Sequence, residues 1–253
     1  MKNIISILIT GGTSGIGKAL CLGYAREGVH IAFSGRNQDR LVETMQLVLD
    51  KGANADATLV DVTDYDGMKS WIERIDREHP IDLVIANAGI ATPGELPLHE
   101  RTVATFDVNV TGVFNTIHPA LELMKKRNHG QIAIVSSIAG YMGMPHSPSY
   151  SASKAALITY GQALRGRYGP HGIRVSVICP GVIHTPMTEN FYRKVPGWKN
   201  TDYAVRKIMK GLERNKGLIA FPWSLHALTR WVSGLPYSWQ ESLVRLYSGR
   251  TRG

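Results

Sequence analysis

Short apolar runs alternate with longer amphipathic stretches along almost the whole chain. Most of the apolar runs are as long as a typical strand, and they lack the in/out alternation of a half-exposed sheet, which indicates burial on both faces of a parallel sheet. The longer stretches repeat their apolar residues at helical spacing. We expect strands at 4–9, 29–34, 55–60, 81–86, 132–135, 174–179 and 218–221, with helices from the first glycine loop to about 27 and at 37–49, 63–79, 101–127, 149–168 and 201–215.

No proline- or glycine-rich linker interrupts this alternation, so residues 1–253 are expected to form one domain. Hydrophobic residues make up 43% of the chain, enough for a sizeable core. After the last strand, two more amphipathic stretches flank Pro236. The pattern predicts an α/β fold: a single Rossmann-type doubly wound parallel sheet of about seven strands, helices on both faces and a helical C-terminal extension.

The first apolar run leads directly into the glycine-rich segment TGGTSGIG, residues 10–17. A strand, a glycine loop and a helix in this order form a phosphate site, because backbone amides and the helix N-terminus point at the anion. Here Gly11, Gly15 and Gly17 are spaced Gly-x-x-x-Gly-x-Gly. Taken alone such a loop is also compatible with a tight turn, but its position between strand and helix favours a nucleotide site.

The end of the second strand indicates which dinucleotide binds. A carboxylate at this place bonds the ribose 2′-hydroxyl of NAD, whereas an arginine accommodates the 2′-phosphate of NADP. No Asp or Glu lies between Gly28 and Gln38, and Arg36 follows the strand. We therefore expect NADP(H) to be preferred over NAD(H). The alternative is a solvated arginine at a turn.

Tyr150 and Lys154 lie four residues apart in the predicted helix 149–168, a spacing that stacks two side chains on one helix face. An ammonium beside a phenol favours the phenolate, so we expect the pKa of Tyr150 to fall and the phenol to act as a general acid or base. Ser137 follows the strand 132–135, at the sheet edge where α/β proteins bind ligands. A Tyr-x-x-x-Lys pair by itself is also a common chance feature of a surface.

Asn109 stands in an otherwise apolar helical segment, where asparagine lowers helix propensity. A buried amide requires hydrogen-bond partners. Asn109 is therefore either a satisfied core amide or a member of the site.

Seven sequence elements together resemble the short-chain dehydrogenase/reductase family in order and spacing. The resemblance runs from about Ile4 to Met187 and weakens afterwards. Ala86 stands where the family more commonly has asparagine, a frequent variant. The elements are TGGTSGIG (10–17), Asp61-Val62, ANAG (86–89), Asn109, Ser137, YSASK (150–154) and PGVIHT (180–185).

The resemblance implies hydride transfer between the nicotinamide C4 and a carbonyl or carbinol carbon. It implies that Tyr150 is the catalytic acid/base, that Lys154 lowers its pKa and holds the nicotinamide ribose, that Ser137 polarises the substrate carbonyl, and that Asn109 supports a proton-relay water. The implied cofactor contacts, besides Arg36, Tyr150 and Lys154, are Gly11, Thr13, Ser14, Gly15, Ile16 and Gly17 at the pyrophosphate, Asp61 and Val62 at the adenine, Asn87, Ala88 and Gly89 beside the cofactor, Pro180 and Gly181 in the turn after the sixth strand, and Ile183 and Thr185 at the nicotinamide carboxamide.

Residues 184–200 correspond to the segment that covers the substrate in this family. This lid offers mainly apolar side chains, which suggests a lipophilic or aromatic carbonyl compound, although the same side chains are equally suited to packing the lid onto the core. They are Met187, Phe191, Tyr192, Val195 and Trp198.

The net charge of +9 is concentrated near the C-terminus: residues 191–253 hold 12 Lys/Arg against 3 Asp/Glu. No recognition helix or RNA-binding signature accompanies this excess, so we expect no nucleic-acid partner. Residues 221–253 form a basic amphipathic tail with apolar stripes. Such stripes are most often buried in the protein or in a subunit interface, and the alternative is peripheral contact with a membrane.

The remaining features limit the cellular setting. Cys21 and Cys179 are the only cysteines and suggest no disulfide framework, and the histidines show no metal-ligand spacing. The chain shows no signal core and no membrane span. We expect a cytoplasmic protein without a metal, either free or peripheral to the inner face of a membrane, and a homodimer or homotetramer as in related family members.

Three functions are compatible with these features. The first is an NADP-dependent oxidoreductase that acts on a soluble, lipophilic carbonyl compound or secondary alcohol. The second is a membrane-associated reductase of a lipid-like 3-keto substrate, and the third is a cofactor-binding regulator that has lost turnover. The presence of Ser137, Tyr150, Lys154 and Asn109 favours an enzyme.

Overall fold

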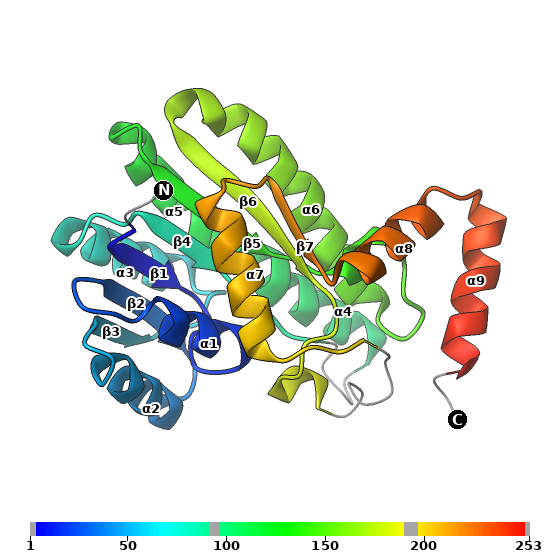
Figure 1. Cartoon of the computed structure of the whole chain (residues 1–253), viewed down its shortest axis with the longest axis horizontal. Coiled ribbons are helices and arrows are strands. Elements are labelled where there is room, and N and C mark those ends of the chain that lie inside the picture. Colours follow the sequence, from blue (N-terminus) through cyan, green and yellow to red (C-terminus); the bar gives the residue numbers. More distant parts are fainter. Residues whose placement is uncertain (1–3, 92–96, 190–196, 251–253) are drawn as a thin grey trace.

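A seven-stranded parallel sheet forms the centre of the molecule (Figure 1). The computed structural model describes residues 4–91, 97–189 and 197–250, with side chains as far as residue 244. The strand order is β3-β2-β1-β4-β5-β6-β7, which confirms the predicted doubly wound sheet. The strands are β1 (Ser6–Ile9), β2 (His30–Gly35), β3 (Asn54–Leu59), β4 (Leu83–Ala86), β5 (Gly130–Val135), β6 (Ile173–Pro180) and β7 (Leu218–Phe221).

Helices cover both faces of this sheet, as predicted. On one face α1, α2 and α7 pack against Ile7, Ile31 and Phe33; on the other, α3, α5 and α6 pack against Leu8 and Val84. Burial on both faces explains why the central strands read as continuous apolar runs. The helices are α1 (Gly15–Tyr24), α2 (Gln38–Leu49), α3 (Tyr65–Glu78), α4 (Leu98–Phe106), α5 (Gly112–Lys126), α6 (Pro148–Tyr168), α7 (Thr201–Glu213), α8 (Trp223–Ser233) and α9 (Tyr237–Arg250).

The predicted continuous helix at 101–127 is wrong in its middle. A π-helical turn, η1 (Asp107–Thr111), separates α4 from α5. Such widened turns often occur at functional sites. Here the turn contains Asn109, whose fully buried amide bonds a loop and a neighbouring helix. A sequence pattern of helical period does not reveal a single widened turn.

The C-terminal extension is helical, as predicted, and consists of α8 and α9. Helix α8 lies beside the sheet edge after β7, and α9 stands clear of the rest of the molecule (Figure 1). Within the described residues, no helix has both the length and the apolar character that crossing a bilayer requires.

Candidate active site

A deep pocket lies where the parallel strands end, beside β1 and β4, where the order in which successive strands join the sheet changes direction. Its volume is about 580 Å³, within the range of a small-molecule or cofactor site. Loops that follow β1, β2, β4, β5 and β6 form its walls. In open α/β sheets this switch point is where ligands bind.

The glycine loop forms one wall of the pocket. Gly11 and Gly15 have φ angles of +67° and +51°, in the left-handed region that favours glycine. Gly17 does not line the pocket; a Cβ on it would stand 2.1 Å from the Gly11 carbonyl oxygen and 2.5 Å from Nδ2 of Asn87. Gly17 thus allows α1 to approach the loop closely, so that the loop amides and the N-terminus of α1 face the pocket.

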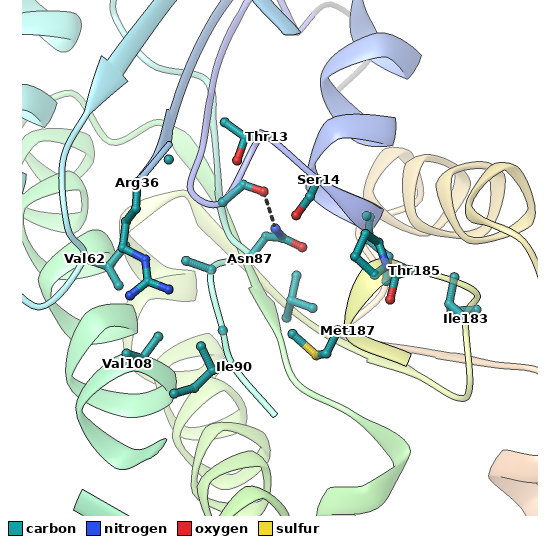
Figure 2. A pocket seen from close by; sticks show the side chains of 18 of the residues that line it. Thr13, Ser14, Arg36, Val62, Asn87, Ile90, Val108, Ile183, Thr185 and Met187 are labelled. Atoms are coloured by element: carbon teal, nitrogen blue, oxygen red, sulfur yellow. Dashed lines mark hydrogen bonds between the residues drawn. The ribbon is translucent and has the colours of Figure 1, made fainter. Parts of the chain in front are cut away.

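Thr10 and Asn87 tie this loop to the end of β4. The amide Nδ2 of Asn87 donates to the carbonyl oxygens of Thr10 (3.0 Å) and Gly11 (3.2 Å). A hydrogen bond of Asn87 is drawn in Figure 2. The Thr10 hydroxyl accepts from the backbone N–H groups of Asn87 and Ala88. Thr10 was not among the predicted site residues, because its contribution is to hold two loops together rather than to line the pocket.

Arginines gather at one end of the pocket, beyond β2. Arg36 extends into the pocket beside Val62 (Figure 2), and its guanidinium lies 3.9 Å from a carboxylate oxygen of Asp61. Arg40, one turn into α2, also lines this end. Asn37 caps α2 by accepting from the Arg40 N–H at 2.9 Å. The sequence prediction named Arg36 and missed Arg40, although the four-residue spacing after Arg36 was available as a signal.

The loop after β6 forms the opposite end. Ile183, Thr185 and Met187 lie on the far side of the pocket from Arg36 (Figure 2). The Thr188 hydroxyl donates to the Ile183 carbonyl at 2.6 Å and accepts from the Thr185 N–H at 3.0 Å, which fixes this turn. Met187 is 45% exposed, so an apolar side chain stands partly free at this end of the pocket.

Ser137, Tyr150 and Lys154 all line the pocket, as their spacing predicts. Ser137 follows β5, and Tyr150 and Lys154 are one turn apart on α6, with the Lys154 Nζ 5.6 Å from the centre of the Tyr150 ring. Lys154 is almost completely buried, and its Nζ donates to the Val135 carbonyl at 3.0 Å. This arrangement places a hydroxyl, a phenol and an ammonium around one region of the pocket.

The expected fall in the Tyr150 pKa is wrong for the chain by itself. Desolvation raises the pKa of Tyr150, and its hydrogen bond with Ser137 lowers the pKa by a smaller amount. Desolvation also lowers the pKa of Lys154 to about 8. Burial therefore disfavours the charged form of both groups, and the Lys154 ammonium is directed to the Val135 carbonyl rather than to the phenol oxygen.

Asn109 is buried behind the wall and does not line the pocket. Its Oδ1 accepts from the Ile90 N–H at 2.8 Å, and its Nδ2 donates to the Ile90 carbonyl at 3.0 Å and the Ser153 hydroxyl at 3.2 Å. The side chain thus holds the loop after β4 against α6. Its expected contact with a relay water stays a prediction.

Apart from Gly17 and Asn109, every predicted site residue lines the pocket, including Thr13, Ser14, Ile16, Asp61, Gly89, Pro180 and Gly181. The pocket walls thus bring together segments that are far apart in the sequence. The prediction missed several lining residues whose types carry no distinctive chemistry: Ser34, Gly35, Val60, Ile90, Val108, Val135, Ser136, Pro186 and Thr188.

The predicted lid is only partly covered by the described residues. Met187 and Trp198 are 45% and 44% exposed, so neither is packed fully into the core. Phe191, Tyr192 and Val195 lie outside the described residues. Across the described parts of the chain, no group of three His, Cys, Asp or Glu side chains forms a metal-ligand set.

The pocket fits a dinucleotide. Its glycine loop and helix N-terminus suit a pyrophosphate, the arginine end suits a phosphorylated ribose, and Tyr150 and Lys154 line the same pocket. No added Cβ is tolerated at Gly17 without displacing backbone, so the close packing of α1 on the glycine loop requires glycine there.

Comparison with known proteins agrees with this geometry. The family model described as "short chain dehydrogenase" matches residues 6–196. An uncharacterized oxidoreductase of Myxococcus xanthus is 35% identical over 232 residues, which are 90% of this chain and 92% of the relative. The 3-oxoacyl-[acyl-carrier-protein] reductase of Thermotoga maritima is 38% identical over 197 residues, which cover 74% of this chain and 77% of the relative.

A solved structure shows a similar fold. The short-chain dehydrogenase from Sphingobium yanoikuyae, solved in complex with NADPH, has a TM-score of 0.81 at 23% sequence identity. The similarity covers 97% of this chain and 94% of that one, so it includes most of the extension beyond residue 196.

Proposed function

The chain belongs to the short-chain dehydrogenase/reductase family and is therefore an NAD(P)-dependent oxidoreductase, and we propose that it prefers NADP(H) and reduces a lipophilic carbonyl compound. The observation that carries the proposal is one continuous pocket with Arg36 and Arg40 at one end and Ser137, Tyr150 and Lys154 farther along its wall.

Each of these side chains has a distinct task in the proposed reaction. The nicotinamide supplies the hydride. The Tyr150 hydroxyl donates a proton to the alkoxide oxygen that develops on the substrate, and the Ser137 hydroxyl polarises the same oxygen. Lys154 places a positive charge near Tyr150, which favours release of the phenol proton. Asn109 keeps the loop after β4 in place and thereby keeps the pocket wall rigid.

The preference for NADP(H) rests on the charges beyond β2. Arg36 and Arg40 are both exposed at the pocket end, where a ribose 2′-phosphate needs cationic donors. Asp61 lies 3.9 Å from Arg36, and this exposed ion pair is weak enough to yield to a doubly charged phosphate.

Arg36→Ala is expected to weaken NADPH binding by about 5- to 150-fold and to leave NADH binding nearly unchanged. A charge-assisted contact of roughly 1 to 3 kcal/mol is lost only for the phosphorylated cofactor. Fluorescence titration with both cofactors measures the two affinities. Arg77→Ala, which removes an exposed arginine from α3 outside the pocket lining, is the matched control. Equal affinity of the unaltered protein for NADPH and NADH would contradict the proposal.

The proposed substrate class rests on the apolar side chains at the pocket mouth. Met187 lines the pocket, and Trp198 precedes Lys199, which pairs with Ile183 in the loop after β6. The similar Thermotoga maritima protein is named as a reductase of 3-oxoacyl chains, which suggests a lipid-like 3-keto compound as one member of the class. A panel of carbonyl and alcohol substrates, run with both cofactors, tests the proposal; preference for small polar aldehydes would contradict it.

We also propose that the protein assembles as a homodimer or homotetramer through α5 and α6. Phe114, His118 and Tyr160 form an aromatic cluster on these helices, with ring centres 4.6 Å apart for Phe114 and Tyr160 and a 2.7 Å contact between His118 and the Tyr160 hydroxyl. The cluster remains partly exposed in the single chain. Light scattering at micromolar concentration should give at least a dimer mass, and Phe114→Asp should reduce it; a monomer mass for the unaltered protein contradicts this prediction.

A cytoplasmic location is part of the proposal. Cys21 and Cys179 are both free thiols and both buried, as suits a reducing compartment.

A further inference from the structure

The last two helices carry a group of large, exposed apolar side chains, which we call the tail surface. Trp223, Trp231 and Tyr237 are 77%, 62% and 82% exposed. Single exposed apolar residues are common on proteins, but a concentration of them marks a contact surface. The tail surface consists of Trp223, Leu228, Trp231, Tyr237, Trp239 and Leu243.

Helix α8 is anchored to the protein by its opposite face. Leu225 packs against the apolar cluster of Ile138, Val177 and Cys179, and Val232 is buried. Trp223 and Trp231 are eight residues apart, about two helical turns, and therefore share a face. Val232 is thus buried within the chain, as expected for the apolar stripes, whereas the tail surface is exposed in the single chain. Burial of the tail surface between subunits stays a prediction.

Two aromatic contacts fix the orientation of α8. The rings of His226 and Tyr141 have centres 5.3 Å apart, and the Arg230 guanidinium lies 5.4 Å from the centre of the Tyr141 ring. Tyr141 belongs to the short helix η2 (Ile138–Tyr141) that follows Ser137. The tryptophans of α8 are therefore held outward by a rigid attachment to the body of the protein.

Helix α9 carries further exposed apolar side chains away from the body. It stands apart from the sheet and its covering helices (Figure 1), and its first residues include the exposed Tyr237, Trp239 and Leu243. Trp239 and Leu243 are four residues apart and share a helix face. No described helix is able to cross a bilayer, so α8 and α9 are suited to lie on a surface rather than to span it.

The charge of the tail distinguishes between possible partners. Residues 221–253 contain four arginines, no lysine and one acidic residue, Glu241. A second copy of the chain presents the same positive tail, so tail-to-tail pairing in a symmetric dimer is opposed by charge. Anionic lipid headgroups attract basic residues, and tryptophan and tyrosine favour the boundary between headgroups and acyl chains.

We propose that the tail surface is a docking surface for anionic phospholipid membranes. The aromatic side chains of α8 and α9 enter the headgroup boundary, and the arginines are attracted to the negative lipids. The opposite face of α8 lies close to the pocket, because Leu225 Cδ2 is 3.0 Å from the position of a Cβ on Gly181, which lines the pocket. Docking is a binding event that needs neither cofactor nor turnover, so its test is independent of the proposed reaction.

Vesicle binding by the full-length protein tests this inference. Three of the five tryptophans, Trp223, Trp231 and Trp239, are in the tail, so their emission reports docking. We expect co-sedimentation and a blue shift with phosphatidylserine–phosphatidylcholine vesicles, loss of both at high salt where charges are screened, and no binding to pure phosphatidylcholine. Trp223→Ser combined with Trp231→Ser is expected to weaken binding by at least about tenfold.

Tyr65→Ser provides the matched control, because Tyr65 is a 49% exposed aromatic residue on α3 outside the tail and its loss should leave vesicle binding unchanged. Unchanged thermal unfolding of the tryptophan variant shows that the fold is kept, as expected for two exposed side chains. Failure to bind anionic vesicles overturns the inference. If the tryptophan variant instead loses a subunit in light scattering without any vesicle binding, the tail surface is an interface between copies of the chain, which also overturns it.

Discussion

Replacing Tyr150 with phenylalanine is expected to lower kcat by about 10²- to 10⁴-fold, the usual contribution of a positioned general acid. The ring remains, so the packing of α6 and the affinity for NADPH should change little. Steady-state kinetics with the best carbonyl substrate of a panel measures the loss, and fluorescence titration measures cofactor binding. The separation of these two quantities distinguishes a lost proton donor from a damaged pocket.

Tyr65→Phe is the matched control, because it removes the same hydroxyl from an exposed tyrosine in the first turn of α3. It should leave kcat unchanged. A Tyr150→Phe variant that keeps activity within about tenfold of the unaltered enzyme would show that the proton comes from another group, since a general acid contributes at least about 10²-fold.

Lys154→Met is expected to stabilise the cofactor-free protein at neutral pH by roughly 2 kcal/mol while strongly lowering activity. Burial lowers the pKa of Lys154 from 10.5 to about 8, so folding at pH 7 places a charge in a dry site at a cost of about 3 kcal/mol. Methionine removes the charge, but it also leaves the Val135 carbonyl without its hydrogen-bond donor. The lost hydrogen bond costs about 1 kcal/mol and reduces the stabilisation by that amount.

The lowered pKa of Lys154 determines at which pH the substitution stabilises the protein. Above the unfolded pKa the lysine is neutral in both states and costs nothing. As the pH falls towards the folded pKa of about 8, the unfolded chain takes up the proton first and the folded protein loses stability. Denaturant unfolding should therefore show that Lys154→Met raises the free energy of unfolding near pH 7. Near pH 10 the increase should be less than about 1 kcal/mol. Lys126→Met, on the exposed end of α5, is the matched control and should leave the free energy of unfolding nearly unchanged at pH 7. A destabilised Lys154→Met at pH 7 would contradict the prediction.

The sheet was predictable because strands that are buried on both faces leave an unmistakable apolar run. The run at 132–135 became β5, and Ser137 therefore came to lie at the edge of the sheet where ligands bind. The Tyr150–Lys154 pair followed from helical spacing alone. Local sequence patterns were therefore sufficient to predict most of the fold and the residues at the centre of the site.

Features that depend on the environment were not predictable in the same way. The pKa shift of Tyr150 depends on how completely the folded chain removes water from the phenol, a quantity that spacing does not contain. The widened turn around Asn109 exists because the amide reaches Ile90 and Ser153, which are distant in sequence. Arg40 is one of many exposed basic side chains, and its residue type alone does not place it at the pocket.

The separation of the two ends of the pocket makes the choice of cofactor and the chemistry independent traits. Arg36 and Arg40 come from one short segment after β2, whereas Ser137, Tyr150 and Thr185 come from other loops and helices. Figure 2 shows Arg36 and Thr185 on different sides of the pocket. Substitutions in the first segment can change the cofactor preference without altering the proton donor. Exchange of a few exposed residues in this segment would therefore be enough, in evolution, to make the same reaction use NADH in place of NADPH.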